Sequence, residues 1–175
     1  MSSGILIRPV RPTDVHDIAT IYAYAVEHGT ASFEIEPPSE AEMATRLKML
    51  LDTGYPYLVA DAGGAVAGYA YCGPYRPRIA YRYSVEDSVY IHPRAARRGI
   101  GRMLLTELVA QAVDRGYRQM VAVIGDSDQT PSIELHRALG FTEVGTLKNI
   151  GFKHGRWLDS VLMQRALGEG AETMP

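Results

Sequence analysis

Apolar residues recur at two spacings along the chain, and their alternation predicts a mixed α/β fold. Apolar side chains three or four positions apart are typical of a helix with one buried face. This spacing predicts four helices, at residues 14–28, 40–53, 99–115 and 130–139. Short runs rich in β-branched and aromatic residues predict strands. These runs lie at residues 5–7, 57–60, 65–72, 85–91, 119–124, 142–146 and 158–163.

The connections between these segments indicate how the sheet is arranged. Asp61-Ala-Gly-Gly64 is a hairpin turn, so the front half of the sheet is predicted to be antiparallel. The helix at 99–115 joins two apolar strands, and a helical crossover is typical of a parallel pair. We therefore expect one domain, residues 1–167, with a mostly antiparallel sheet, one parallel pair and flanking helices. Residues 168–175 are predicted to form a disordered tail.

Composition and charge exclude several classes of protein. The chain has 175 residues and a formal net charge of −2, which gives no sign of nucleic-acid or anionic-membrane binding. The sequence shows neither an apolar signal segment nor a stretch that would span a bilayer, so a cytoplasmic protein is expected. Cys72 is the single cysteine and lies in an apolar run, so it is predicted to be a core residue.

One stretch, from Val85 to Leu105, combines a strand, a glycine-rich turn and the start of a helix. The unpaired amides and positive dipole of a helix N-terminus suit an anion, so Gly99-Ile100-Gly101 is a candidate pyrophosphate cradle, with added charge from Arg97, Arg98 and Arg102. An ordinary strand-to-helix turn on a basic surface is the alternative. Position 104 is Leu, so the dinucleotide-binding fingerprint is incomplete.

Two further segments carry candidate chemistry. Arg76 and Arg78 lie in a loop stiffened by Pro77, and two rigidly held guanidinium groups suit a carboxylate. A solvated basic hairpin is the alternative, and arginine–tyrosine stacking on nucleic acid is a weaker one. Glu86 and Asp87 are adjacent on a strand, so they point to opposite faces. One of them is a candidate proton acceptor facing a cleft.

The basic turn and a second segment, Ser132–Phe141, resemble the two signatures of the GNAT N-acetyltransferases. The resemblance is closer still to one branch, the phosphinothricin and methionine sulfoximine N-acetyltransferases, and runs from about Ile5 to Arg165. The matching segments follow that branch in order and spacing. They are Thr30–Glu34, Gly68–Tyr71, Gly73–Pro74, Val85–Glu86, Ser88–Tyr90, Val121–Gly125, Leu135–His136, Gly145–Thr146 and Phe152–Gly155.

The resemblance implies the GNAT fold, with a splayed parallel strand pair, acetyl-CoA as cosubstrate and no metal. It implies that Glu86 is the general base and that the protein is a homodimer. The implied acetyl-CoA contacts are Val89, Tyr90, Ile91, Arg97, Arg98, Gly99, Ile100, Gly101, Arg102, Gln129 and Ser132. The implied substrate contacts are Phe33, Arg76, Pro77, Arg78, Glu86, Asp87 and Ser88. From the residues alone, Phe33 is equally compatible with a loop side chain folded onto the core.

The chain departs from the family pattern at three positions. Ala96 stands where Gln or Arg is usual, and Gln129 stands where Asn is preferred. His136 stands where many family members have a tyrosine that protonates the leaving thiolate, although the phosphinothricin branch also has His there. We assign no role to His136.

These observations favour an N-acetyltransferase that moves acetyl from acetyl-CoA to the α-amine of a small amino-acid analogue by direct attack. The expected acceptors are phosphinothricin, methionine sulfoximine and methionine sulfone, and the expected partners are this small molecule and acetyl-CoA. One alternative keeps the chemistry and changes the acceptor to a protein N-terminus, a polyamine or an antibiotic. The other is a non-catalytic acetyl-CoA sensor.

Overall fold

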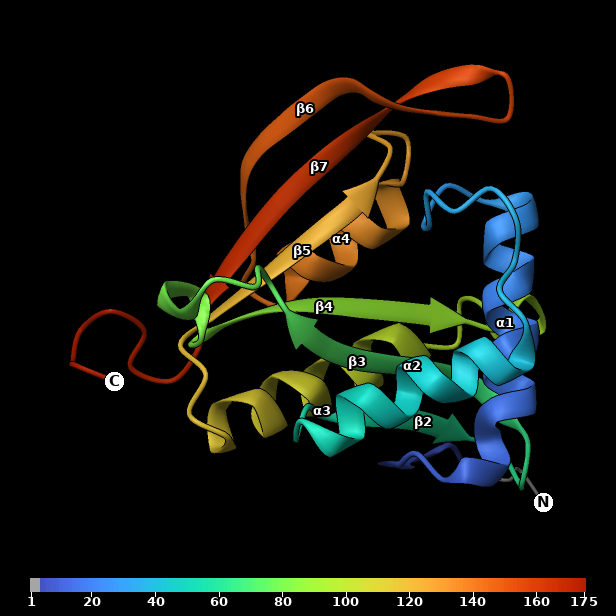
Figure 1. The fold of residues 1–175 in the computed structure, drawn as a ribbon, viewed down its shortest axis with the longest axis horizontal. Coiled ribbons are helices and arrows are strands. Elements are labelled where there is room, and N and C mark those ends of the chain that lie inside the picture. Colours follow the sequence, from blue (N-terminus) through green and yellow to red (C-terminus); the bar gives the residue numbers. More distant parts are fainter. Residues whose placement is uncertain (1–3) are drawn as a thin grey trace.

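A computed structural model describes residues 4–175, which form a seven-stranded mixed sheet in the order β1-β2-β3-β4-β5-β7-β6 (Figure 1). The strands are β1 (Leu6–Pro9), β2 (Tyr57–Asp61), β3 (Val66–Pro74), β4 (Ser84–Ile91), β5 (Gln119–Gly125), β6 (Thr142–Lys153) and β7 (Arg156–Ala166). The α-helices are α1 (Val15–His28), α2 (Glu40–Asp52), α3 (Ile100–Asp114) and α4 (Thr130–Ala138). Short 3-10 turns are η1 (Pro12–Asp14), η2 (Ile79–Tyr81) and η3 (Pro93–Ala95).

The one parallel pairing, between β4 and β5, extends over only half of β4. It begins at Ser84 opposite Gln119 and ends at Asp87 opposite Ala122. Beyond this point the two strands diverge (Figure 1). All the other neighbouring strands pair antiparallel. The predicted fold class, a mostly antiparallel sheet with one splayed parallel pair and flanking helices, is confirmed.

The helices bury two cores on opposite faces of the sheet. On one face, α3 contributes Leu104, Leu105 and Leu108, which pack with Met120 and Phe141. On the other face, α1 and α2 cover strands β2 to β4. Apolar side chains buried in this way each stabilise the fold by roughly 1.5–3 kcal/mol. The two cores hold β4 in place from both sides, so the end of its pairing with β5 is a fixed feature of the fold.

The β6–β7 hairpin is longer than the sequence predicts. The expected strands were 142–146 and 158–163, whereas β6 continues to Lys153 and β7 begins at Arg156. The reason is an irregularity in pairing between Leu147 and Gly151, where Asn149 has a φ of 52°. A bulge of this kind interrupts the two-residue alternation on which strand prediction rests.

The face of β5, β6 and β7 opposite α3 and α4 carries exposed apolar side chains. Val123 is 40% exposed and Val144 is 56% exposed. Nearby, Tyr75, Tyr81 and Leu162 line a groove of about 210 Å³ that Val144 also borders. This apolar face adjoins the loop between β3 and β4.

The last residues run in turns beside the sheet. Gly170 N donates to the Leu167 carbonyl at 2.9 Å, and the Arg118 guanidinium donates to the Met174 carbonyl at 3.2 Å. The domain boundary at residue 167 and the disorder of the tail stay predictions. Among residues 4–175, no helix is long and apolar enough to cross a membrane.

Candidate active site

A cavity of about 360 Å³ lies where β4 and β5 part. Its walls come from both strands, from the loop between α1 and α2, and from α4. It is lined by Ala31, Ser32, Phe33, Tyr71, Glu86, Asp87, Ser88, Val89, Tyr90, Ala122, Val123, Ile124, Gly125, Gln129, Ser132, His136 and Ser160. The splay therefore produces a cavity in which side chains from distant segments meet.

Glu86 lies in the cavity wall at the last part of the β4–β5 pairing, opposite Val121. Burial raises the pKa of Glu86, and the charge of Asp87 raises it further, while Arg76 opposes both. A carboxylate with a raised pKa holds a proton more readily than an exposed one. Glu86 thus has the position and the basicity of a group that accepts a proton from a bound amine.

Asp87 forms a buried ion pair with His136. Its Oδ2 is 2.9 Å from His136 Nε2, and His136 Nδ1 is 2.7 Å from the Ser132 carbonyl. Both partners of the ring accept hydrogen bonds, so the geometry favours an imidazolium that donates from both nitrogens. Burial lowers the pKa of His136, but the hydrogen bond and charge of Asp87 and the Ser132 carbonyl outweigh it, and the pKa is raised.

The same pair leaves one acceptor atom in the cavity wall. Asp87 Oδ1 is buried and has no hydrogen-bond partner among residues 4–175. A buried carboxylate oxygen without a donor is costly, so a donor from a bound molecule or water fits here. Nothing in the sequence indicates the contact between Asp87 and His136, because the two residues are 49 positions apart.

The predicted pyrophosphate cradle is exposed at the start of α3. Left-handed backbone at Arg97 (φ 63°) and Gly99 (φ 75°) turns the chain sharply into the helix. Arg97, Arg98 and Arg102 are exposed around the first turn, where helix amides lack intrahelical partners. Such a turn fits an anionic pyrophosphate.

Gly101 has a packing role that the sequence did not indicate. A Cβ at this position would lie 3.1 Å from Cδ2 of Leu135 on α4. This glycine therefore allows α3 and α4 to approach closely, and α4 carries Ser132 and His136 to the cavity. At Gly99 a Cβ would meet nothing within 4 Å, so the glycine is required there by its positive φ.

Most of the other predicted acetyl-CoA contacts lie in the cavity between the diverging strands. Val89, Tyr90, Gln129 and Ser132 line the cavity, whereas Ile91 lies outside its lining. The Gln129 amide already donates to Thr30 Oγ1 at 3.0 Å. The pairing of β4 with β5 ends at Asp87, so the backbone of Ser88–Ile91 has no β5 partner and is available to the predicted pantetheine arm.

The predicted substrate contacts divide into two groups. Phe33, Glu86, Asp87 and Ser88 line the cavity. Arg76, Pro77 and Arg78 lie on the exposed loop before β4, outside the cavity lining. Arg76 stacks on Tyr75, 5.1 Å from the ring centroid, and its charge lowers the pKa of Glu86. One chain therefore brings the first group together and leaves the two arginines outside the cavity lining.

Residues 4–175 contain no group of three or more His, Cys, Asp or Glu side chains placed to hold a metal ion. Cys72 is a buried free thiol in the core, and burial raises its pKa well above the ordinary value.

A family model described as "Acetyltransferase (GNAT) family" matches residues 17–141. The chain belongs to this family. The match spans the α1–α2 loop, the splayed strands and α4, so every residue of the cavity lining except Ser160 on β7 lies within it.

Named relatives match this chain over almost its whole length. It is 52% identical to a phosphinothricin N-acetyltransferase of Alcaligenes faecalis over 97% of this chain and 86% of that one. It is 39% identical to an L-methionine sulfoximine/L-methionine sulfone acetyltransferase of Salmonella typhimurium, over 94% and 96%. A phosphinothricin acetyltransferase structure from Sinorhizobium meliloti, in complex with AcCoA, has a TM-score of 0.94 and 51% identity, covering 100% and 94%.

The predicted family, fold and enzyme class are thereby confirmed. This chain is an acetyl-CoA-dependent N-acetyltransferase. The roles of individual residues stay predictions, including the general base, the acetyl-CoA contacts and the arginine clamp.

Proposed function

We propose that this enzyme acetylates the α-amine of a small amino-acid analogue, with phosphinothricin, methionine sulfoximine and methionine sulfone as the acceptors to test first. The relatives named for these acceptors match the chain almost end to end. The observation that carries the proposal is Glu86, a half-buried carboxylate with a raised pKa in the wall of the splay cavity.

In the proposed reaction the acceptor enters as an ammonium ion, and Glu86 takes a proton from it directly or through water. The free amine attacks the carbonyl carbon of the acetyl thioester and forms the C–N bond. The C–S bond then breaks, and the sulfur leaves as CoA thiolate. The nitrogen then gives its second proton to solvent water or to the departing thiolate and becomes a neutral amide, so charge and atoms balance.

The cosubstrate is proposed to lie along the helix side of the splay. The exposed turn at Arg97–Arg102 would hold the pyrophosphate, and β4 from Val89 to Ile91 would bind the pantetheine arm through its backbone. When bound, acetyl-CoA supplies the activated acetyl group. The chain's own contribution is to orient the thioester beside Glu86 and to keep the amine and the carbonyl carbon within reach.

We further propose a homodimer that brings Arg76 and Arg78 into a complete acceptor site. The two arginines are exposed and lie outside the cavity lining in one chain, and the apolar face next to their loop carries the exposed Val144. Val144→Glu should shift sedimentation from dimer to monomer, whereas Met49→Glu on α2, a side chain of similar exposure, should not. A monomeric wild type would contradict this proposal.

A cytoplasmic location is proposed from the chemistry of the cosubstrate and the free thiol of Cys72. Cell fractionation followed by an activity assay is the direct check: activity outside the cytoplasmic fraction would contradict it.

The acceptor assignment is tested by CoA thiol release from acetyl-CoA in the presence of single acceptors. Turnover with phosphinothricin or methionine sulfoximine, with a higher KM for the acceptor in Arg76→Ala, is the expected result. Release only with spermidine or a short peptide would keep the enzyme class and overturn the acceptor. Binding of acetyl-CoA with no release for any acceptor would favour a sensor instead.

A further inference from the structure

Residues Gly29–Glu34, which we call the acceptor strap, follow α1 in the loop that leads to α2, and they pass over the splay cavity. Ala31, Ser32 and Phe33 form part of the cavity wall. The strap has no regular secondary structure, so its position depends on side-chain anchors. These anchors come from both sides of the splay.

The anchors on the β5–β7 side are hydrogen bonds to atoms far away in sequence. Thr30 Oγ1 donates to the Gly125 carbonyl at 2.8 Å. Lys153 Nζ donates to the Ser32 carbonyl at 2.7 Å, and His154 Nε2 lies 3.1 Å from the Gly29 carbonyl. The strap is thereby tied to the end of β5 and to the tip of the β6–β7 hairpin.

Lys153 is the most unusual of these anchors. It is only 4% exposed, although lysine is almost never buried unless it has a partner. Burial lowers its pKa, while Glu34 opposes this effect. A buried ammonium is costly to keep, and its contact with a strap carbonyl gives it a specific use.

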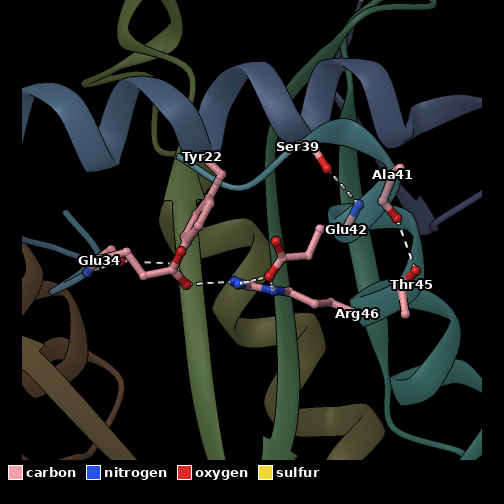
Figure 2. Close-up of polar contacts among 8 residues, drawn as sticks. Tyr22, Glu34, Ser39, Ala41, Glu42, Thr45 and Arg46 are labelled. Atoms are coloured by element: carbon pink, nitrogen blue, oxygen red, sulfur yellow. Dashed lines mark hydrogen bonds and ion pairs between the residues drawn. The ribbon is translucent and has the colours of Figure 1, made fainter. Parts of the chain in front are cut away.

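The anchors on the helical side form a network around Glu34 (Figure 2). Tyr22 on α1 donates to Glu34 Oε1 at 3.0 Å, and Arg46 on α2 donates to the same oxygen at 2.6 Å. Tyr22 Oη also lies 2.9 Å from Ser32 Oγ. Arg46 makes a second ion pair, with Glu42 on its own helix, which does not touch the strap.

The ring of Phe33 occupies a recess between two glycines on the far side of the splay. A Cβ built at Gly151 would lie 2.4 Å from Phe33 Cε2, and one at Gly125 would lie 2.9 Å from Cε1. A contact under 3.0 Å requires the ring to move. Because Phe33 lines the cavity, its movement would change the shape of the space available to an acceptor.

We propose that Lys153, Arg46 and Gly151 are positioning residues that act through the acceptor strap and determine which amines fit beside Glu86. The β4–β5 pairing ends at Asp87 and Ala122, and the strap is tied to both sides of the gap beyond it. This inference rests on the proposed function, since it concerns the acceptor of that reaction. It adds residues that lie outside the cavity lining to the determinants of specificity.

The first test compares two carboxylates that share one arginine. Glu34→Gln removes the ion pair that holds the strap, and Glu42→Gln removes only the pair within α2. Glu34→Gln and Lys153→Met should each raise the KM for the acceptor about tenfold, with the KM for acetyl-CoA within about twofold of the wild type. Glu42→Gln should leave both constants near wild type.

The second test uses two glycines of the same strand. Gly151→Ala should displace Phe33 and raise the acceptor KM most for the bulkiest acceptor, whereas a Cβ at Gly145 meets nothing within 4 Å. Phe33→Ala combined with Gly151→Ala should remove the clash and restore the acceptor KM to that of Phe33→Ala alone. Equal changes of the acceptor KM in Gly151→Ala and Gly145→Ala would contradict the proposed role of the recess around Phe33.

A third measurement separates the strap from the acceptor assignment. Hydrogen exchange of the amides at residues 29–34 should accelerate about tenfold in Lys153→Met and Glu34→Gln but not in Glu42→Gln. This readout holds even if no amino-acid analogue is acetylated, so failure of the proposed function leaves it intact. Unchanged exchange, or equal rises in the KM for acceptor and acetyl-CoA, would overturn the inference.

Discussion

The two sides of the proposed active site are built in different ways. The predicted acetyl-CoA cradle lies outside the cavity lining and is one contiguous segment, since Arg97 to Arg102 are consecutive and form one turn at the start of α3. The acceptor side consists of side chains that meet across the whole chain: Thr30 contacts Gly125, and Ser32 contacts Lys153, 121 positions away. The cradle is local, and the acceptor side depends on the complete fold.

This difference has a physical consequence. A cradle of backbone amides at a helix N-terminus is present whenever the helix forms. It therefore tolerates a changed side chain, such as the Ala96 that stands where Gln or Arg is usual, and it needs few contacts from the rest of the fold. A wall made of long-range contacts requires every anchor to be in place. We therefore expect substitutions on the acceptor side to change specificity, and substitutions on the acetyl-CoA side to change affinity modestly.

The largest expected effect concerns Glu86, which lies in the cavity wall near the end of the β4–β5 pairing. Glu86→Gln removes the proton acceptor and keeps the shape, so kcat should fall by about 10²- to 10⁴-fold. Binding of acetyl-CoA, measured by calorimetry, should stay within about twofold. Glu107→Gln, an exposed change on α3, should have wild-type rates. Only a small fall of kcat in Glu86→Gln would mean that water alone accepts the proton.

The pH dependence sharpens this prediction. Glu86 accepts a proton only when ionised, and burial raises its pKa. The wild-type kcat/KM should therefore rise with pH through a value above the ordinary carboxyl value of 4.5. In Glu86→Gln this rise of kcat/KM with pH should be absent. A rise that persists unchanged would assign the titration to another group.

The second expected effect is on stability. Asp87→Asn leaves the buried His136 without its counter-ion, so the free energy of unfolding should fall by about 3 kcal/mol. Chemical denaturation measures it, with the exposed Asp128→Asn as the control. The raised pKa of His136 implies stabilisation that is fully present below 6.5 and lost as pH rises through the raised value. Asp87→Asn should lose this pH dependence. An equal slope of the unfolding free energy against pH in the wild type and in Asp87→Asn would contradict the ion pair between Asp87 and His136.

How far the sequence predicts the site follows the same division between local and long-range structure. The strand, the glycine turn and the helix from Ser84 to Asp114 were predicted within one residue, because each depends on neighbours in sequence. The splay followed from the family resemblance. The length of β6 was underestimated, because the bulge near Asn149 hides its alternation.

The residues that sequence reasoning missed are those whose partners lie far away. The sequence assigns no role to His136, yet it pairs with Asp87 in the cavity wall. Nothing in the sequence indicates that Lys153 is buried or that it holds the Ser32 carbonyl. No spacing rule connects such pairs, because register and helix packing decide which side chains meet.

The smallest expected effect is on the acetyl-CoA side. Arg98→Ala removes one exposed charge from a cradle whose donors are backbone amides, so the KM for acetyl-CoA should rise only about two- to fivefold at low salt. The difference from wild type should shrink at about 1 M salt, because screening weakens exposed charges. Lys48→Ala on α2 removes an equal charge far from the turn and should leave this KM unchanged. A rise of the acetyl-CoA KM in Arg98→Ala that exceeds about 100-fold and persists in salt would show that the cradle, too, depends on a specific side-chain contact.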